Sequence, residues 1–281
     1  MSDLFDFAAV KKFAVMGNPV AHSKSPRIHA LFAQQCGVRL EYTAIQVDLG
    51  GFRQAVDQFR AHGGSGLNVT VPYKLEAFAL AEALSERARF AHAVNTLKFT
   101  GEAVFGDNTD GVGLVRDLVE NLQTPVRDRR VLIVGAGGAV RGVLGPLREQ
   151  QPARLIIANR TVDKARDLAA LFVDDKVVHA LGLEQLEGES FDIVINGTAA
   201  SLKGEVPALP PTLFAPNALA YDMMYSDRAT PFMEWAQAHG AARGVDGLGM
   251  LVEQAAESFL IWHNRRPQTS PVIGALRMPK S

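Results

Sequence analysis

The chain has 281 residues, 47% of them hydrophobic and 21% charged, so it can bury a large core as one large domain or two smaller ones. Its formal net charge of -1 excludes an overall field that would attract nucleic acid or an anionic membrane. Cys36 is the only cysteine, which excludes an intramolecular disulfide or a cysteine zinc cluster and fits a cytoplasmic setting. The start MSDLFDF has no basic segment, and no run of about 18 apolar residues occurs, so we expect neither a signal peptide nor a membrane span.

Short apolar runs alternate with helical periodicity along the chain, which predicts an α/β fold with parallel strands. The first series of elements predicts, in chain order, a strand over 12–17, a helix over 25–35, a strand over 41–47, a helix over 51–61, a strand within 66–74, a long helix over 75–91, a hairpin over 95–107 that turns at 100–102, and a helix over 111–122.

A second series begins after a connection over 123–130. Its expected strands lie within 130–134, 154–161, 192–198 and 218–225, and its expected helices lie over 162–172, 230–240 and 249–264. The two series indicate two α/β units that meet near Asp110.

The segment HSKSPRIHALF places two serines at the start of a predicted helix. Ser25 followed by Pro26 is a helix-start signal, and we expect the Ser25 hydroxyl to cap the first turn. Ser23 lies two residues earlier and is not needed as a cap. Because a helix N-terminus favours a carboxylate or a phosphate, Ser23 is a candidate anion ligand.

The segment VLIVGAGGAVRGVL runs from an apolar strand through a glycine-rich turn into a helix, a context typical of dinucleotide binding. Gly135 would permit the tight turn, and Gly137 would let the backbone approach a pyrophosphate. Val140 replaces the third glycine of the usual fingerprint. A glycine-rich turn without a ligand is the structural alternative.

The next predicted strand ends in Asn159, Arg160 and Thr161, where an NAD-binding unit would place an acidic residue for the ribose 2′-hydroxyl. A guanidinium and a hydroxyl suit a 2′-phosphate instead. The pattern favours NADP over NAD, and an exposed loop arginine is the alternative.

Three polar segments could supply a site for carbonyl reduction. Asn68 and Thr70 alternate along one face of a predicted strand, with Lys74 at its carboxyl end, and Asn95 and Asp110 follow in later turns. Each residue alone has an ordinary structural explanation, as a solvated lysine, a turn residue or a helix cap. Jointly they matter because carbonyl reduction needs a proton donor and a group that orients it, which a Lys/Asp pair provides.

With these motifs in order, the sequence resembles the shikimate dehydrogenase family over nearly its whole length. The shared segments are SKSP, NVTVPYK, AVNTL, GDNTDG, GAGGA, NRT, YDMMY and DGLGMLVEQAA. The resemblance implies NADPH-dependent, reversible reduction of 3-dehydroshikimate to shikimate, on the route to chorismate and the aromatic amino acids.

The resemblance also assigns roles and domains. The implied catalytic residues are Lys74 and Asp110. The implied substrate-binding residues are Ser23, Ser25, Asn68, Thr70, Lys74, Asn95, Asp110, Tyr225 and Gln254. The implied cofactor-binding residues are Gly135, Ala136, Gly137, Gly138, Ala139, Asn159, Arg160, Thr161, Thr198, Met223 and Gly247. The implied fold joins an N-terminal α/β substrate domain, residues 1–112 completed by 248–281, to a Rossmann-like doubly wound NADP-binding domain, residues 113–247.

Three alternatives stay open at this point. They are a quinate or dual-substrate dehydrogenase, a methylene-tetrahydrofolate dehydrogenase, which should lack the SKSP segment, and an NADP-binding sensor without chemistry. The seven histidines show no metal-ligand spacing, so we expect no metal. We expect a small-molecule substrate, neither a nucleic-acid nor a membrane partner, and a cytoplasmic monomer or homodimer.

Overall fold

The structure is a computed structural model that describes residues 10–278, apart from the side chain of Leu202. Residues 1–9, on which the expectation of no signal peptide rests, and 279–281 lie outside the described residues. The chain forms two compact units. The first comprises the described residues up to Ala88, His92–Asp107 and Ala255–Gln268, and the second comprises Arg89–Ala91, Asn108–Gln254 and the described residues from Thr269 onward.

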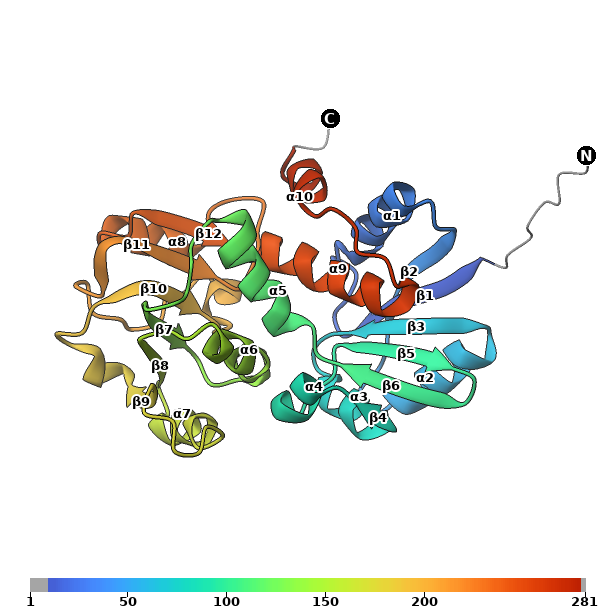
Figure 1. Cartoon of the computed structure of the whole chain (residues 1–281), viewed down its shortest axis with the longest axis horizontal. Coiled ribbons are helices and arrows are strands. Elements are labelled where there is room, and N and C mark those ends of the chain that lie inside the picture. Colours follow the sequence, from blue (N-terminus) through green and yellow to red (C-terminus); the bar gives the residue numbers. More distant parts are fainter. Residues whose placement is uncertain (1–9, 279–281) are drawn as a thin grey trace, which may run out of the picture. The chain divides into compact units, whose positions relative to one another are not determined.

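The first unit is built on a mixed sheet with the strand order β2-β1-β3-β5-β6-β4 (Figure 1). Its strands are β1 (Lys11–Gly17), β2 (Leu40–Gln46), β3 (Gly64–Val69), β4 (Ala83–Leu84), β5 (Thr96–Thr100) and β6 (Ala103–Asp107). The strands β2, β1 and β3 are parallel, whereas β5 is antiparallel to both β3 and β6. The predicted hairpin is confirmed, and Gly101, with φ +59°, supplies the left-handed conformation of its turn.

Helices cover this sheet and complete its core. They are α1 (Ser25–Cys36), α2 (Phe52–Ala61) and α3 (Lys74–Leu80), with part of α4 (Glu86–Ala91) and of α9 (Leu248–His263). The indole of Trp262 on α9 donates to the carbonyl of Leu97 at 2.9 Å. A side chain at Gly66 would collide with that indole, so glycine lets α9 reach the sheet.

The predicted long helix over 75–91 is wrong. The backbone leaves the helical conformation at Ala81, where ψ is 130°, and β4 then pairs with β6 before α4 begins. The hydroxyl of Ser85 accepts from the N–H of Ala88 at 3.1 Å and donates to Asp107 at 2.5 Å. The serine therefore starts a second helix at a point where sheet pairing satisfies the intervening backbone.

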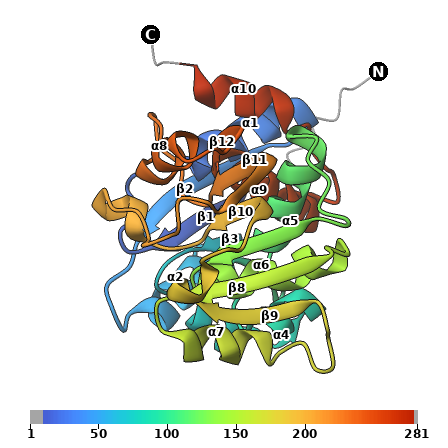
Figure 2. The same ribbon diagram turned by 90° about the vertical axis from the view of Figure 1, so that its left-hand side faces the viewer.

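The second unit is built on a fully parallel sheet with the strand order β12-β11-β10-β7-β8-β9 (Figure 2). Its strands are β7 (Arg130–Val134), β8 (Arg154–Asn159), β9 (Val178–Gly182), β10 (Phe191–Asn196), β11 (Phe214–Asp222) and β12 (Arg243–Asp246). Its helices are α5 (Asp110–Arg116), which continues into a π-helical turn (Asp117–Asn121), α6 (Gly138–Glu149), α7 (Val162–Ala169), α8 (Pro231–Ala238) and α10 (Ser270–Arg277). Short 3₁₀ turns occupy Leu183–Leu186 and Ala200–Lys203. The strands β9 and β12 were not predicted, whereas α10 falls within 248–281, where the family resemblance implied C-terminal helices.

Alternate residues of β7 enter two different cores. Val131 and Ile133 pack with Val140 of α6 in one buried cluster, whereas Leu132 packs with Phe232 of α8 in another. Helices thus cover both faces of the parallel sheet, and the predicted α/β, doubly wound class is confirmed. Val140, which replaces the third fingerprint glycine, is fully buried in the first of these clusters.

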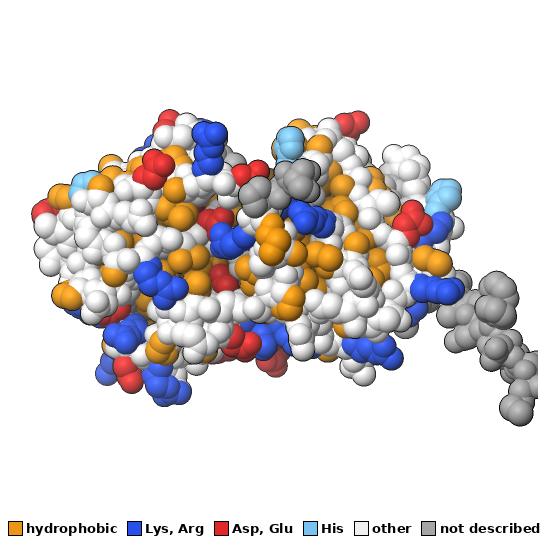
Figure 3. Space-filling view, turned by 90° about the horizontal axis from the view of Figure 1, so that it is seen from above, with side chains coloured by type: hydrophobic (Ala, Val, Ile, Leu, Met, Phe, Trp, Pro, Cys, Tyr) orange, Lys and Arg blue, Asp and Glu red, His pale blue; other side chains and the backbone are white. Residues whose placement is uncertain are grey.

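The predicted domains are a substrate domain, 1–112 with 248–281, and an NADP-binding domain, 113–247. This division by ligand stays a prediction. By compactness, residues 108–112, 248–254 and 269–278 group with the second unit. Among residues 10–278 there is no helix with the length and apolar character that crossing a bilayer requires. Basic and acidic side chains are interspersed on the face seen in Figure 3.

Candidate active site

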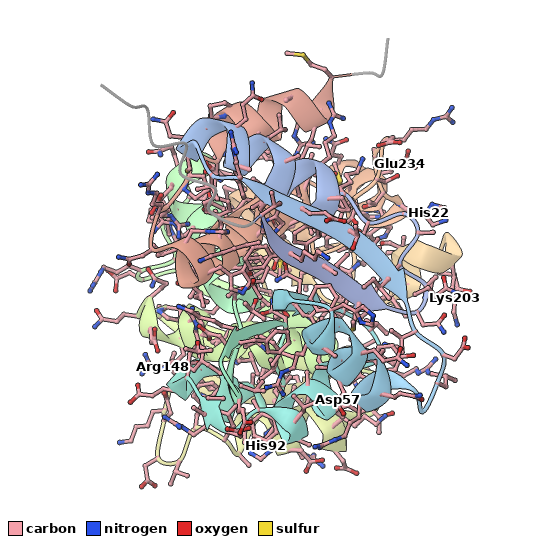
Figure 4. The ribbon with its side chains drawn as sticks, turned by 90° about the vertical axis from the view of Figure 1, so that its right-hand side faces the viewer. His22, Asp57, His92, Arg148, Lys203 and Glu234 are labelled. Atoms are coloured by element: carbon pink, nitrogen blue, oxygen red, sulfur yellow. The ribbon has the colours of Figure 1, made fainter. Side chains whose placement is uncertain are left out.

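At the start of α1, Ser23 and not Ser25 supplies the side-chain oxygen that accepts a backbone N–H. Ser25 is itself the first helical residue, and its side chain makes no capping bond. The hydroxyl of Ser23 instead accepts from the N–H of Ser25 at 3.2 Å. The prediction that Ser25 caps the helix is therefore wrong, because its backbone is already inside the first turn. His22, just before this pair, is exposed in the loop between β1 and α1 (Figure 4).

The carboxyl end of β3 brings several predicted substrate residues together. The amide of Asn68 donates to the carbonyl of Asn95 at 3.3 Å. Thr70 lies one residue beyond the end of β3, but its N–H still donates to the carbonyl of Met16 on β1 at 2.9 Å, so its place on one strand face with Asn68 stays a prediction. Lys74 begins α3, and its carbonyl accepts from the N–H of Val94, next to Asn95, at 2.9 Å.

Sequence reasoning missed Tyr42 on β2. Its hydroxyl donates to the side-chain oxygen of Asn68 at 2.7 Å, and burial raises its pKa well above the ordinary value. The strand EYTAIQV carries no motif that marks this tyrosine. In the sheet β1 lies between β2 and β3, and the long side chain of Tyr42 reaches past it to Asn68.

In the second unit, the segment GDNTDG starts α5. The side chain of Asn108 accepts from the N–H of Asp110 at 3.1 Å, and the carboxyl group of Asp110 is buried at 7% exposure. Thr109 donates to the side chain of Gln254 at 3.3 Å. A side chain at Gly113 would lie 2.8 Å from the Cβ of Gln254, so glycine allows α5 and the start of α9 to pack closely. The structure thus brings Asp110 and Gln254 to one place.

The predicted nicotinamide residues also meet. The N–H of Met223 donates to the carbonyl of Asn196 at 2.9 Å, and Gly247 lies so close to the carbonyl of Met223 that a side chain there would collide with it. The carboxyl group of Asp222, fully buried, accepts from Thr230 at 2.6 Å and Ser201 at 2.7 Å. Two residues beyond Met223, burial raises the pKa of the Tyr225 hydroxyl.

The glycine turn has the geometry of a phosphate cradle. Gly135 has φ +113°, a conformation that favours glycine, and its N–H donates to the carbonyl of Ala158 at 2.8 Å. Gly137 precedes α6, and Ala139 lies in its first turn. A Cβ atom at Gly137 or Gly138 would meet no atom within 4 Å, so the backbone is open to a ligand at the helix N-terminus. Ala136 lies between these glycines.

A pocket of about 630 Å³ lies at the carboxyl ends of the second sheet. Asn159, Arg160 and Thr198 all line it, and their contact with a cofactor stays a prediction. Thr161 precedes α7 and does not line the pocket. Sequence reasoning missed Lys203 (Figure 4) and the apolar wall, which includes Leu183 and Val206.

The predicted catalytic pair is divided between the two units. Lys74 belongs to the first and Asp110 to the second, so their pairing stays a prediction. Within residues 10–278 no cluster of three or more His, Cys, Asp or Glu side chains could hold a metal ion.

Three family models match the chain in order. Residues 15–97 match the shikimate dehydrogenase substrate binding domain, residues 117–203 match shikimate / quinate 5-dehydrogenase, and residues 247–277 match the shikimate 5′-dehydrogenase C-terminal domain.

Individual proteins agree with these models. A shikimate dehydrogenase (NADP(+)) of Aromatoleum aromaticum is 56% identical over 271 residues, 95% of this chain and 97% of the relative. A crystal structure of an Ael1 enzyme from Pseudomonas putida has a TM-score of 0.90 and 48% identity, covering 96% of this chain and 99% of that one. The Thermus thermophilus shikimate 5-dehydrogenase in complex with NADP(H) and shikimate has a TM-score of 0.85 and 32% identity, covering 95% and 99%. By sequence and by fold, the chain belongs to the shikimate dehydrogenase family.

Proposed function

We propose that this chain is an NADP-dependent shikimate dehydrogenase that reversibly reduces 3-dehydroshikimate to shikimate, on the route to chorismate and the aromatic amino acids. The observation that carries the cofactor choice is the end of β8, where Asn159 and Arg160 line the pocket. An amide and a guanidinium occupy the place where an NAD enzyme would carry an acidic residue. A guanidinium matches a 2′-phosphate through charge-assisted hydrogen bonds.

The residues present fit a dinucleotide. The turn Gly135–Gly138 would hold the pyrophosphate at the open N-terminus of α6, and Arg160 with Thr161 would hold the 2′-phosphate. Thr198, Met223 and Gly247 would line the rest of the cofactor site. When bound, NADPH supplies a hydride to the ring ketone.

Lys74 acts as the proton donor in this proposal. Its ammonium group gives a proton to the oxygen that gains charge during reduction, and its neutral amine takes the proton back in the oxidation direction. Asp110 orients Lys74 and accepts from the neighbouring ring hydroxyl. General acid and base assistance of this kind contributes about two to four orders of magnitude in rate.

The remaining substrate residues divide by chemistry. Ser23 and Ser25, at the N-terminus of α1, and the hydroxyl of Tyr225 bind the carboxylate through neutral donors and the helix dipole. The ring hydroxyls contact a set of amide, hydroxyl and carboxyl groups, namely Asn68, Thr70, Asn95, Asp110 and Gln254.

We further propose a cytoplasmic monomer or homodimer. The single cysteine suits a reducing compartment. Light scattering after size-exclusion chromatography distinguishes the two assembly states, and a larger particle would contradict both.

The first experiment measures reduced-nicotinamide absorbance with shikimate or quinate, each combined with NADP+ or NAD+. Rapid reduction with shikimate and NADP+ alone is the expected result. Activity with quinate or with NAD+ would assign the chain to the dual-specificity branch, and no activity in any combination would favour a cofactor-binding sensor.

Two variants test the assigned roles. Lys74→Ala should lower kcat by about two to four orders of magnitude while NADPH binding stays intact, with exposed Lys12→Ala as the control. Arg160→Ala should raise KM for NADP+ by about ten- to a hundredfold and leave KM for NAD+ nearly unchanged. A fully active Lys74→Ala enzyme would refute the assignment of Lys74 as the proton donor.

A further inference from the structure

Two buried polar side chains end adjacent strands of the second sheet. Asn196 ends β10 and Asp222 ends β11; the two are register partners, and both are fully buried. The pocket turn, residues 198–203, follows Asn196 and contributes Thr198 and Lys203 to the lining of the 630 Å³ pocket. The hydrogen bonds of the buried pair therefore decide how this wall of the pocket is built.

The carboxyl group of Asp222 accepts four hydrogen bonds. One oxygen accepts from the side-chain amide of Asn196 at 3.2 Å and from the N–H of Met224 at 3.1 Å. The other oxygen accepts from the hydroxyls of Ser201 at 2.7 Å and Thr230 at 2.6 Å. One buried group thus ties the pocket turn, through Ser201, to the backbone of the segment that follows β11.

The directions of the hydrogen bonds around Asn196 follow from groups that can only donate or only accept. The backbone N–H of Thr198 donates to Asn196 at 3.1 Å, so the atom that faces it is the amide oxygen. The hydroxyl of Thr198 lies 2.7 Å from the same oxygen and must donate to it. The amide nitrogen then donates to Asp222 and, at 3.4 Å, to the hydroxyl oxygen of Ser201.

Both hydroxyls of the pocket turn are therefore committed to the protein. Thr198 gives its single proton to Asn196 and accepts from a backbone N–H two residues further on at 3.3 Å. Ser201 accepts from Asn196 and gives its proton to Asp222. Neither hydroxyl keeps a proton for a phosphate group. Thr198 instead presents its methyl group to the glycine turn, where a Cβ at Gly135 would lie 3.3 Å from it.

We propose that Ser201 and Asp222 form a cofactor-positioning pair, which holds the pocket turn in the shape that receives the nicotinamide dinucleotide. This inference rests on the proposed function for the identity of the cofactor. The turn then contributes a preformed wall of backbone and methyl groups, while the phosphate groups are left to the glycine turn and to Arg160. A carboxylate suits this role because its two oxygens can accept from four donors at once.

The test is Ser201→Ala, which removes the hydroxyl that ties the pocket turn to Asp222. The Kd for NADPH, measured by isothermal titration calorimetry, should rise about five- to tenfold, because the released turn has to be ordered when the cofactor binds.

Thr230→Val is the matched control for this measurement. Its hydroxyl donates to the same oxygen of Asp222, at 2.6 Å instead of 2.7 Å, but Thr230 caps α8, and no described residue of α8 lines the pocket. The control should lower Tm at least as much as Ser201→Ala, because the cap is lost as well, and leave the Kd for NADPH within about twofold. A wild-type Kd for Ser201→Ala, or equal increases for the two variants, would overturn the inference.

A double-mutant cycle tests whether Thr198 acts through the same network. Thr198→Val keeps a methyl group and removes the proton given to Asn196. It should raise the Kd for NADPH about five- to tenfold alone and by less than about threefold in a Ser201→Ala background, because the turn is already released there. Equal factors in both backgrounds would make Thr198 an independent ligand and overturn the inference.

Thr198→Val also decides the question if Ser201→Ala does not fold. The proton of Thr198 is not available to the cofactor, so a raised Kd for NADPH would come from the released turn. An unchanged Kd would overturn the inference.

The two levels of the proposal fail differently. A wild-type protein that binds no NADPH would refute both. A protein that binds NADPH but never oxidises shikimate would refute the proposed function alone, since the Kd of Ser201→Ala still decides the inference. An active wild-type protein with an unaffected Ser201→Ala variant would refute the inference alone.

Discussion

Replacing His29 by phenylalanine should make the stability of the protein less sensitive to acid. His29 is fully buried and stacks on Tyr42, with Trp262 5.3 Å away between centroids. Burial, and then the nearby charge of His263, lower the pKa of His29 to about 3 from 6.5. Phenylalanine keeps an aromatic ring in this cluster and removes the titrating group.

The sign follows from counting protons. Between pH 6.5 and pH 3 the unfolded chain protonates position 29 and the native chain does not, so the free energy of unfolding falls as the pH falls. At about 1.4 kcal/mol per pH unit below the unfolded pKa, the loss from pH 7 to pH 5 is about 2 kcal/mol. The half-buried His263, with a pKa lowered to about 4, acts in the same direction and is retained in the variant.

The assay is urea denaturation at pH 7 and pH 5 for the wild type and for His29→Phe. The wild type should lose about 2 kcal/mol more than the variant over this interval, whatever the effect of the substitution at pH 7. Exposed His62→Phe controls for the loss of a histidine as such. Parallel pH dependences for the wild type and His29→Phe, within about 0.5 kcal/mol, would refute the assignment of a neutral, buried His29.

Three further substitutions test close contacts elsewhere. Gly249→Ala should cost about 1–3 kcal/mol in urea denaturation, because a Cβ there would collide with the carboxyl group of Asp117; an unchanged midpoint would contradict the packing described. Asp222→Asn should cost about 2–3 kcal/mol, since an amide N–H would face the donating hydroxyl of Thr230, and calorimetry would show the lowered Tm. Ser23→Ala should raise KM for shikimate far more than it lowers kcat in steady-state kinetics, and unchanged affinity would remove Ser23 from the site.

Local pattern was sufficient wherever an element's own residues determine its conformation. The glycine turn was predictable because Gly135 needs a positive φ and an apolar strand precedes it. The β5–β6 hairpin was predictable because Gly101 lies between two alternating runs. The strand β8 was also predictable, because the apolar run 155–158 precedes Asn159 and Arg160, whose contact with a cofactor stays a prediction.

Elements that depend on distant partners were not predictable in this way. The segment over 75–91 has continuous helical periodicity, yet β4 forms because β6 offers its edge and Ser85 bonds to Asp107. The strand β12 is only Arg243–Asp246, and it exists because β11 pairs with it. Local propensity carries no information about either partner.

The cap at α1 shows how the same limit reaches the site. A sequence can indicate that one of two serines starts a helix, but which hydroxyl accepts the N–H depends on where the backbone enters the first turn. Here the hydroxyl of Ser23 accepts the N–H of Ser25 at 3.2 Å, although the Ser25–Pro26 signal indicated Ser25. The hydrogen bonds of a motif residue are therefore decided partly by residues outside the motif, as at Asn68, whose amide donates to Ser258 at 2.9 Å and to Thr96 at 3.2 Å.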